Sequence, residues 1–327
     1  MPGRRNSWIS RQSQIVRCSS PPLSRGEGIG QWPGVATLGF HGRVKLFAVL
    51  GPRGKSCAQF AMRPSLLVST VASERDVSVG PWCDDERARR YDSAGNGHFY
   101  RTLLARLVAG AGPFPAGRGL DLGCGSGFAT EGLLQAFPGV AWQGVDVSAP
   151  MLARAAHKPT LAAVPLRHAA AEALPYAAGS FDVVVCNFSW HWFGPGAGEE
   201  VLRVLRPGGW LLVSAPLRRL SSAPGNRWLA RRLHARRRSF RRLASQGLRI
   251  EEMASLLPGA LRTRRLESAV IEESFPDASA LLATLESRGS LHAIFGADGC
   301  EACGTPAAGD LAFEWHVGLL HAQVSDS

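Results

Sequence analysis

The sequence lacks a long hydrophobic run and a regular cysteine framework. No apolar stretch in its 327 residues reaches the roughly 18 to 20 residues of a membrane-spanning helix. Its seven cysteines are odd in number and scattered over a long chain, which is not typical of a disulfide-stabilised domain. The sequence therefore predicts a protein without membrane helices in a reducing compartment, with the cytoplasm as the default location.

The first quarter of the chain has few acidic residues. Residues 1–75 contain eleven Lys and Arg but only Glu27 and Glu74, so this stretch carries +9 of the chain's total charge of +11. It is rich in Arg, Ser, Gly and Pro and has no sustained periodicity, so we expect residues 1–80 to be a largely disordered basic extension. Three interpretations stay open: a mitochondrial transit peptide, a basic arm for nucleic acid, or a start assigned too early, with Met62 as the true beginning.

Residues 81–327 have the texture of a folded domain in which strands and helices alternate. Short apolar runs predict strands at 118–123, 141–148, 181–188, 208–216, 264–275 and 311–322. Helical periodicity predicts helices at 127–137, 148–156, 198–206 and 277–289, and one earlier helix within 84–112 that ends at Gly110. This alternation indicates an α/β fold with a doubly wound, mostly parallel sheet, whose ligands bind at the carboxyl ends of the strands.

Three glycines at alternate positions follow the first of these strands. The stretch "LDLGCGSG" places Asp121 before Gly123, Gly125 and Gly127, a G-x-G-x-G spacing that departs from the G-x-G-x-x-G of nicotinamide-dinucleotide sites. Asp146 ends the next strand, where a carboxylate can accept both hydroxyls of a ribose. The pattern indicates a nucleoside rather than a pyrophosphate, and the alternative is a plain βα turn without a ligand.

The stretch resembles the first motif, E/D-x-G-x-G-x-G, of the class I S-adenosylmethionine-dependent methyltransferases. The segments "AEALPYAAGSFDVVVCN" and "VLRVLRPGGWLLVS" resemble two further motifs of that family in the same order. The resemblance implies a Rossmann-like seven-stranded sheet and S-adenosylmethionine as the cofactor, with glycines that let the backbone approach its methionine part. It also implies that Asp121 lies where it can interact with the cofactor's ammonium group.

The resemblance implies a set of cofactor-binding residues on these motifs. They are Tyr91, Asp121, Gly123, Gly125, Gly127, Asp146, Val147, Met151, Ala171, Glu172 and Asn187. One position departs from the family, because Ala170 stands where an Asp often contacts the adenine amino group. We therefore expect adenine to be held by the backbone around Ala171 and by apolar packing.

Other segments resemble one group within the family. "ARRYDSAGNGHFY" resembles the start of methyltransferases that close a helix over the cofactor, so Tyr91 is either a lid residue or an ordinary helix-surface tyrosine. "NFSWHWF" and "FPDASALLATLESRGSLHAIFG" resemble the malonyl-acyl-carrier-protein O-methyltransferases of biotin synthesis, and the resemblance covers about Asp85 to Ala322. It implies methylation of a carboxylate on a small acid or on malonyl-acyl carrier protein.

Such a reaction needs no general base, because a carboxylate is ionised at neutral pH. No catalytic residue is assigned with certainty; His191 and Trp192 could line the acceptor pocket, with His191 either a proton acceptor or part of the pocket wall. Two alternatives remain. One is a methyltransferase of another small metabolite, and the other is a fold relative that transfers no methyl group and acts as an assembly factor or protein hydroxylase.

Ten arginines gather in a stretch without acid, and we expect them on an inserted helix within residues 217–247. They are Arg218, Arg219, Arg227, Arg231, Arg232, Arg236, Arg237, Arg238, Arg241 and Arg242. Three interpretations are open: a docking surface for an acidic partner such as an acyl carrier protein, a solvated helix face, or a phosphate-binding surface for nucleic acid. The last is disfavoured, because no recognisable RNA-binding module accompanies the arginines.

One Cys-x-x-Cys pair lies near the end of the chain. Cys300 and Cys303 have neither a second pair nor a histidine at metal spacing. The pair is better interpreted as two free thiols in a loop than as a zinc site, so no metal is expected.

Overall fold

The computed structural model describes most of the chain beyond residue 81. The described residues are 35–38, 46–49, 82, 84–112, 114, 116–219, 221–234, 248–255, 257–290 and 308–325. The chain divides into two compact units, Met1–Arg75 and Asp76–Ser327.

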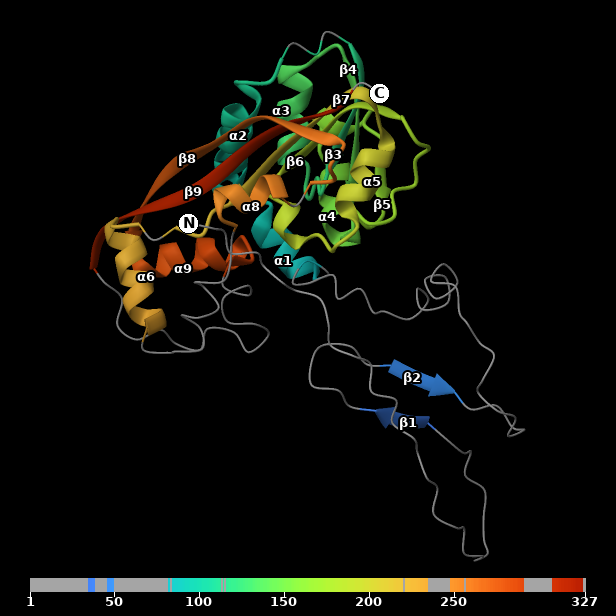
Figure 1. Cartoon of the computed structure of the whole chain (residues 1–327). Helices are drawn as coiled ribbons and strands as arrows, with labels where there is room; N and C mark the ends of the chain where they lie inside the picture. Colours follow the sequence, from blue (N-terminus) through green and yellow to red (C-terminus); the bar gives the residue numbers. More distant parts are fainter. Residues whose placement is uncertain are drawn as a thin grey trace, which may run out of the picture. The chain divides into compact units, whose positions relative to one another are not determined.

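The first unit contains two short strands, β1 (Val35–Leu38) and β2 (Leu46–Val49). They pair antiparallel, with Val35 opposite Val49, and appear as the two blue arrows in Figure 1. The rest of the expected basic extension, Met62 included, lies outside the described residues. Its disorder and its origin therefore stay predictions.

The second unit is built on a seven-stranded sheet with the order β5-β4-β3-β6-β7-β9-β8. Its strands are β3 (Gly117–Leu122), β4 (Val140–Asp146), β5 (Leu166–His168), β6 (Phe181–Asn187), β7 (Leu205–Pro216), β8 (Leu261–Asp277) and β9 (Ala308–Val324). Neighbouring strands from β5 to β7 run parallel, whereas β9 pairs antiparallel with both β7 and β8. The predicted α/β class with a mostly parallel, doubly wound seven-stranded sheet is confirmed.

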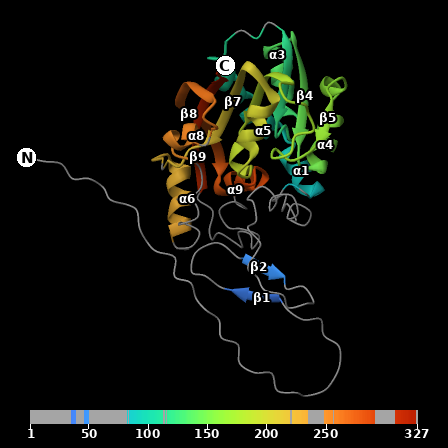
Figure 2. The ribbon, with the colours of Figure 1, turned by 45° about the vertical axis from the view of Figure 1, so that its right-hand side comes forward.

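Helices cover both faces of this sheet (Figures 1 and 2). They are α1 (Asp85–Tyr91), α2 (Ala94–Val108), α3 (Phe128–Ala136), α4 (Ala149–Ala156), α5 (Ala197–Val204), α6 (Pro224–His234), α8 (Ile250–Ser255) and α9 (Ala278–Ser287). The short 3₁₀ turns η3 (Pro159–Leu161) and η4 (Trp190–Trp192) follow α4 and β6. None of the described helices is long and apolar enough to cross a bilayer.

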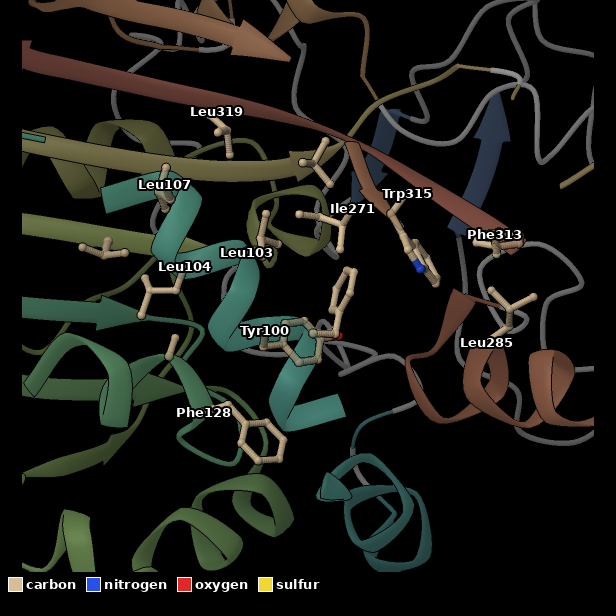
Figure 3. Close-up of a cluster of buried hydrophobic side chains, with 14 of the residues drawn as sticks. Tyr100, Leu103, Leu104, Leu107, Phe128, Ile271, Leu285, Phe313, Trp315 and Leu319 are labelled. Atoms are coloured by element: carbon tan, nitrogen blue, oxygen red, sulfur yellow. The ribbon is translucent and has the colours of Figure 1, made fainter. Parts of the chain in front are cut away.

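Two buried clusters hold the helices to the sheet. One joins side chains of α2, α3, α6 and α9 to the strands, and the other joins α5 and α8 to the opposite face. Figure 3 shows the first cluster, in which Leu103 and Leu107 of α2 face Ile271, Trp315 and Leu319 of β8 and β9. The central strand β6 is buried over almost its whole length, which explains its continuous apolar run "VVVC".

The single helix expected within 84–112 is wrong, because the structure divides this stretch into α1 and α2. Asp84 caps the first helix by accepting from Arg87 N, and Ser93 caps the second by accepting from Asn96 N. A Ser at the new N-terminus satisfies an amide that would otherwise lack a partner, so the chain stops and restarts at Asp92 and Ser93. Helix α2 ends at Val108, just before the predicted stop at Gly110.

Other boundaries follow the expectation more closely. The strands expected at 264–275 and 311–322 are present as the longer β8 and β9, and the helix between them is α9. The short strand β5 and the helix α8 were not predicted. Helix α6 occupies part of the expected Arg-rich insertion, whereas residues 235–247 lie outside the described part of the chain, so a helix through that whole stretch stays a prediction.

Candidate active site

The glycine turn lies between β3 and α3, at the carboxyl edge of the parallel strands. Its three glycines have positive φ angles, which disfavour any residue with a side chain. A Cβ atom on Gly123 would lie 2.5 Å from Ser189 Oγ, and one on Gly127 would collide with Leu161. A Cβ on Gly125 would meet only Tyr91, at 3.8 Å. Gly125 is therefore where the backbone is open to a ligand, with Tyr91 beside it, while the outer two glycines permit close packing.

Asp121, the acid that opens this motif, is completely buried at the end of β3. Its Oδ2 accepts a hydrogen bond of 2.6 Å from Thr130 Oγ1, whereas its Oδ1 has no partner. Burial raises the pKa of the Asp121 carboxyl to about 7, against the effect of Thr130, and the charge of Asp146 adds to the rise. A buried acceptor without a donor is costly, so this oxygen is suited to a cationic ligand.

Asp146, at the end of β4, is bound to the turn by backbone amides. Its Oδ2 accepts from Gly125 N and its Oδ1 from Ser148 N, both at 2.8 Å. Burial raises its pKa, although these two amides act in the opposite direction. Each carboxylate oxygen has a further lone pair, so the group can still accept from two hydroxyls.

The residues after Asp146 support the edge of the site. The carbonyl of Val147 is 2.8 Å from His168 Nε2. Met151 is buried in α4, which begins at the cap formed by Ser148 Oγ and Met151 N. The hydrogen bond between Ser148 and Met151 therefore fixes where α4 starts, next to the carboxylate of Asp146.

The third motif lies just after β5. Ala171 is buried, whereas Glu172 is exposed and accepts a hydrogen bond from Gly194 N. Glu172 thus connects this segment to the loop that follows η4.

Asn187 ends β6 and is occupied by protein partners. Its Nδ2 donates to the carbonyl of Tyr100 at 3.1 Å, and its Oδ1 accepts from Ser214 Oγ at 2.9 Å. The next residue, Phe188, has φ +63°, the only positive φ of a non-glycine residue in the described chain. A strained backbone of this kind persists where the surroundings hold it and often marks a functional site.

His191 and Trp192 lie on η4, three and four residues after this strained residue. The ring of His191 is 5.5 Å from that of Phe188 and 4.9 Å from that of Trp192, measured between centroids. His191 Nδ1 is buried and has no hydrogen-bond partner. Burial lowers the pKa of His191 to about 4, so the ring is neutral at neutral pH.

The segment from Trp82 to Asp92 is anchored beside α4. Ser148 Oγ donates to the carbonyl of Trp82 at 2.5 Å, and Lys158 Nζ lies 3.2 Å from Asp92 Oδ1. Tyr91 lies between these two anchors in sequence, and burial raises the pKa of its hydroxyl, with Tyr100 and Asp146 adding to the rise. We call residues 82 and 84–92 the lid segment, and its role as a lid over a ligand stays a prediction.

A buried polar network holds the lid segment from the other side. Asn96 Nδ2 donates to the carbonyl of Tyr91 at 2.9 Å, and Asn96 Oδ1 accepts from Arg288 Nε at 2.8 Å. Arg288, whose side chain is 1% exposed, binds both carboxylate oxygens of Glu273 at 2.5 and 2.8 Å. Trp315 Nε1 donates to the same carboxylate at 2.6 Å. The network connects α9, β8 and β9 to the lid segment.

The structure therefore brings together part of the predicted cofactor set. Tyr91, Asp121, Gly125 and Asp146 lie around one turn, with Val147 and Met151 beside it, whereas Glu172 and Asn187 are tied to other parts of the protein. Sequence reasoning missed Thr130, Ser148, Trp82, Lys158 and Arg288. Only Ser148 carried a readable signal, since a Ser before an apolar helix is a typical N-cap.

No cluster of three or more metal-ligating side chains occurs among the residues that the structure describes. The Cys300–Cys303 pair lies outside them, so the interpretation as free thiols stays a prediction.

Comparisons with known proteins agree with the fold and the turn. A family model described as "Methyltransferase domain" matches residues 120–213. A malonyl-[acyl-carrier protein] O-methyltransferase of Methylococcus capsulatus is 31% identical over 65% of this chain and 80% of its own length. One from Alcanivorax borkumensis is 40% identical, but the match spans only 36% of this chain and 40% of that relative.

A relative with another name matches the same region. A demethylmenaquinone methyltransferase of Beutenbergia cavernae is 38% identical over 40% of this chain and 55% of its own length. The motifs, the sheet order and the long match to the Methylococcus protein all indicate one family. The chain belongs to the class I S-adenosylmethionine-dependent methyltransferases.

Proposed function

We propose that this chain methylates a carboxylate, carried either by a small acid or by malonyl-acyl carrier protein. The observation that carries the cofactor assignment is the unpartnered, fully buried Oδ1 of Asp121, beneath a turn that is open at Gly125. The two named relatives from Methylococcus and Alcanivorax support the acceptor.

The residues of the site fit S-adenosylmethionine. Asp121 would accept from its ammonium group, Asp146 from its ribose hydroxyls, and Tyr91 would cover it. The backbone around the buried Ala171 would hold the adenine. When bound, the cofactor supplies an electrophilic methyl group on a sulfonium.

The protein's own task is then to position the acceptor and to keep water away. An acceptor carboxylate is already ionised at neutral pH, so no proton has to be removed. His191, neutral at that pH, can hydrogen-bond the acceptor through its unpartnered Nδ1 without adding charge. Holding the nucleophile close to the methyl group can supply a large part of the rate enhancement.

Helix α6 presents part of the proposed docking surface for an acidic carrier protein. Arg227 and Arg231 are exposed on it, and Arg232 lies over the ring of Trp228 at 4.9 Å. Complementary charge would raise the rate of encounter and would be screened by salt. The arginines from Arg236 onward lie outside the described residues.

Methylation of another small metabolite is the second candidate. Two cations that contact the lid segment and its network, Lys158 and Arg288, are each paired with an acid and so are not free to anchor an anionic acceptor. The relative from Beutenbergia carries the name of a demethylmenaquinone methyltransferase. A non-methylating role has no specific observation in its favour.

One experiment separates these possibilities. The full chain is incubated with S-adenosylmethionine labelled on its methyl group and with malonyl-acyl carrier protein, and label is followed into base-labile ester. The proposal predicts labelled ester with the malonyl form and none with the unacylated carrier protein. Cofactor binding without labelled ester would refute malonyl-acyl carrier protein as the acceptor and leave a small acid or another small metabolite.

Arginine docking is tested in the same assay. Arg227→Gln with Arg231→Gln should raise KM for the carrier-protein substrate at low salt and change it little at high salt. An unchanged KM at low salt would refute a docking role for α6.

A further inference from the structure

Six aromatic side chains at the site form one closed circuit. In order, they are Trp82, Tyr91, Tyr100, Phe188, His191 and Trp192, and each ring contacts the next. The centroid separations lie between 4.9 Å and 6.2 Å, and the contact of 6.0 Å between Trp192 and Trp82 closes the circuit. Most of these contacts are edge-to-face, a favourable geometry for aromatic pairs.

The circuit is drawn from two stretches of the chain. Trp82, Tyr91 and Tyr100 belong to the first, which contains the lid segment and α2. Phe188, His191 and Trp192 belong to the second, which follows β6 and contains η4. All of them meet at the carboxyl edge of the parallel strands, beside the glycine turn. Tyr91 marks this position, because it is the only neighbour that a Cβ on Gly125 would meet.

Tyr100 belongs to the buried hydrophobic cluster and Tyr91 and Phe188 pack against it, whereas Trp82 and Trp192 are not part of that cluster. Only Tyr100 is buried, whereas four of the others are half-buried and Trp192 is 37% exposed. Within the described chain, Trp192 and Val270 are the only exposed large hydrophobic residues. An aromatic surface left partly open where a ligand is expected points to a contact with that ligand.

The charges around the circuit favour a cation. Asp146 lies close enough to raise the pKa of Tyr91, and the carboxyl of Asp121 lies beneath the same turn. Two cations near the circuit are paired with acids, Arg288 with Glu273 and Lys158 with Asp92. Aromatic faces attract cations through their quadrupole, most strongly when the cation is shielded from water.

We propose that this aromatic circuit binds the sulfonium of S-adenosylmethionine and selects it over the uncharged sulfur of S-adenosylhomocysteine. The proposal rests on the function proposed above, and it adds a role for six residues. Transfer of the methyl group removes the positive charge, so the circuit loses its attraction for the cofactor when the reaction is complete. Selection for the sulfonium would thus also favour release of the product.

The test compares the affinities of three ligands by calorimetry. They are S-adenosylmethionine, S-adenosylhomocysteine and sinefungin, in which a cationic amine replaces the sulfonium. Trp192→Leu should weaken binding of the two cationic ligands by about tenfold and that of the uncharged one by less than about twofold. Trp192→Phe, which keeps an aromatic face, should restore most of the selectivity.

Phe137→Leu is the matched control. Phe137 is also a half-buried aromatic residue, with its ring 5.2 Å from that of Phe114, but it lies before β4, outside the circuit. This variant should leave the ratio of the affinities unchanged.

Two failures are distinguishable. If Trp192→Leu weakens all three ligands equally, or none of them, the selective role of the circuit is refuted while cofactor binding stands. If the unmodified chain binds none of the three ligands, the proposed function itself fails.

Discussion

Two acids near the same edge of the sheet, Glu273 and Asp121, differ in how their carboxylate oxygens are hydrogen-bonded. Glu273 of β8 has both carboxylate oxygens bonded, by Arg288 and by Trp315. Asp121 of β3 has one oxygen bonded to Thr130 and one without any donor, although it is the more deeply buried of the two. The first acid is satisfied by the protein alone, and the second is not.

This difference in hydrogen bonding indicates a structural role for Glu273 and a ligand-binding role for Asp121. A buried group that lacks a partner lowers stability, so the fold keeps it where a ligand supplies the missing partner. A fully bonded ion pair has no capacity left for a ligand and instead fixes the elements around it, here α2, α9 and the lid segment. Asp146 is intermediate, because its partners are backbone amides that leave room for hydroxyl donors.

The largest expected effect on stability follows from breaking the buried ion pair between Glu273 and Arg288. Glu273→Gln leaves the guanidinium of Arg288 buried without a counter-charge, so we expect a loss of about 3 to 5 kcal/mol in the free energy of unfolding. Denaturant titration measures it. Glu267→Gln is the control on the same strand. Glu267 pairs with Arg265 in a partly exposed position, so this substitution should cost less than about 1 kcal/mol. Equal losses for the two variants would contradict the structural role of Glu273.

A smaller effect, on cofactor affinity, is expected from substitution of Asp146. Asp146→Ala removes the acceptor for the ribose hydroxyls and for Gly125 N, so S-adenosylmethionine should bind roughly tenfold to a hundredfold more weakly. Asp146→Asn, which keeps one oxygen, should lose less. Calorimetry measures both affinities. An unchanged affinity in Asp146→Ala would show that Asp146 does not contact the ribose.

A third effect, with the opposite sign, is expected for stability in Asp121→Asn. The folded carboxyl has its pKa raised to about 7, so the folded state retains a proton that the unfolded state releases above its ordinary pKa near 3.8. The unmodified protein therefore loses stability as pH rises from about 4 to 7, and above that range the cost stays constant. Asp121→Asn should be the more stable protein at pH 8 and should have little advantage at pH 4. Thermal unfolding across this range measures the difference, and a pH-independent difference would contradict the raised pKa.

Local pattern was enough to predict the glycine turn and the strands on either side of it. The glycine spacing and Asp146 lie at strand ends that apolar runs identify, so the parallel topology brings them together at one edge. The break between α1 and α2 was missed although Asp92 and Ser93 carry a capping signal, because the helical spacing of Tyr100, Leu103 and Leu107 was extended backward over it.

The network around Arg288 could not be predicted in the same way. Asn96 and Arg288 are 192 residues apart, and each looks like a surface residue of its own helix. They meet only because β8 and β9 extend the sheet beyond β7 and carry α9 toward the lid segment (Figure 1). The aromatic circuit has the same origin, since its members come from two distant stretches, residues 82–100 and 188–192, whose approach depends on the fold.

The most direct test of the account is a calorimetric measurement of protons exchanged when S-adenosylmethionine binds. At pH 6 the Asp121 carboxyl, with a pKa of about 7, is mostly protonated before the ligand arrives. An ammonium group placed against its free oxygen would lower that pKa. Titrations in two buffers of different ionisation enthalpy should therefore show protons released on binding at pH 6, fewer at pH 8, and none attributable to this site in Asp121→Asn. Binding with the same proton count in Asp121→Asn as in the unmodified chain would contradict the assignment of this buried acid to the cofactor.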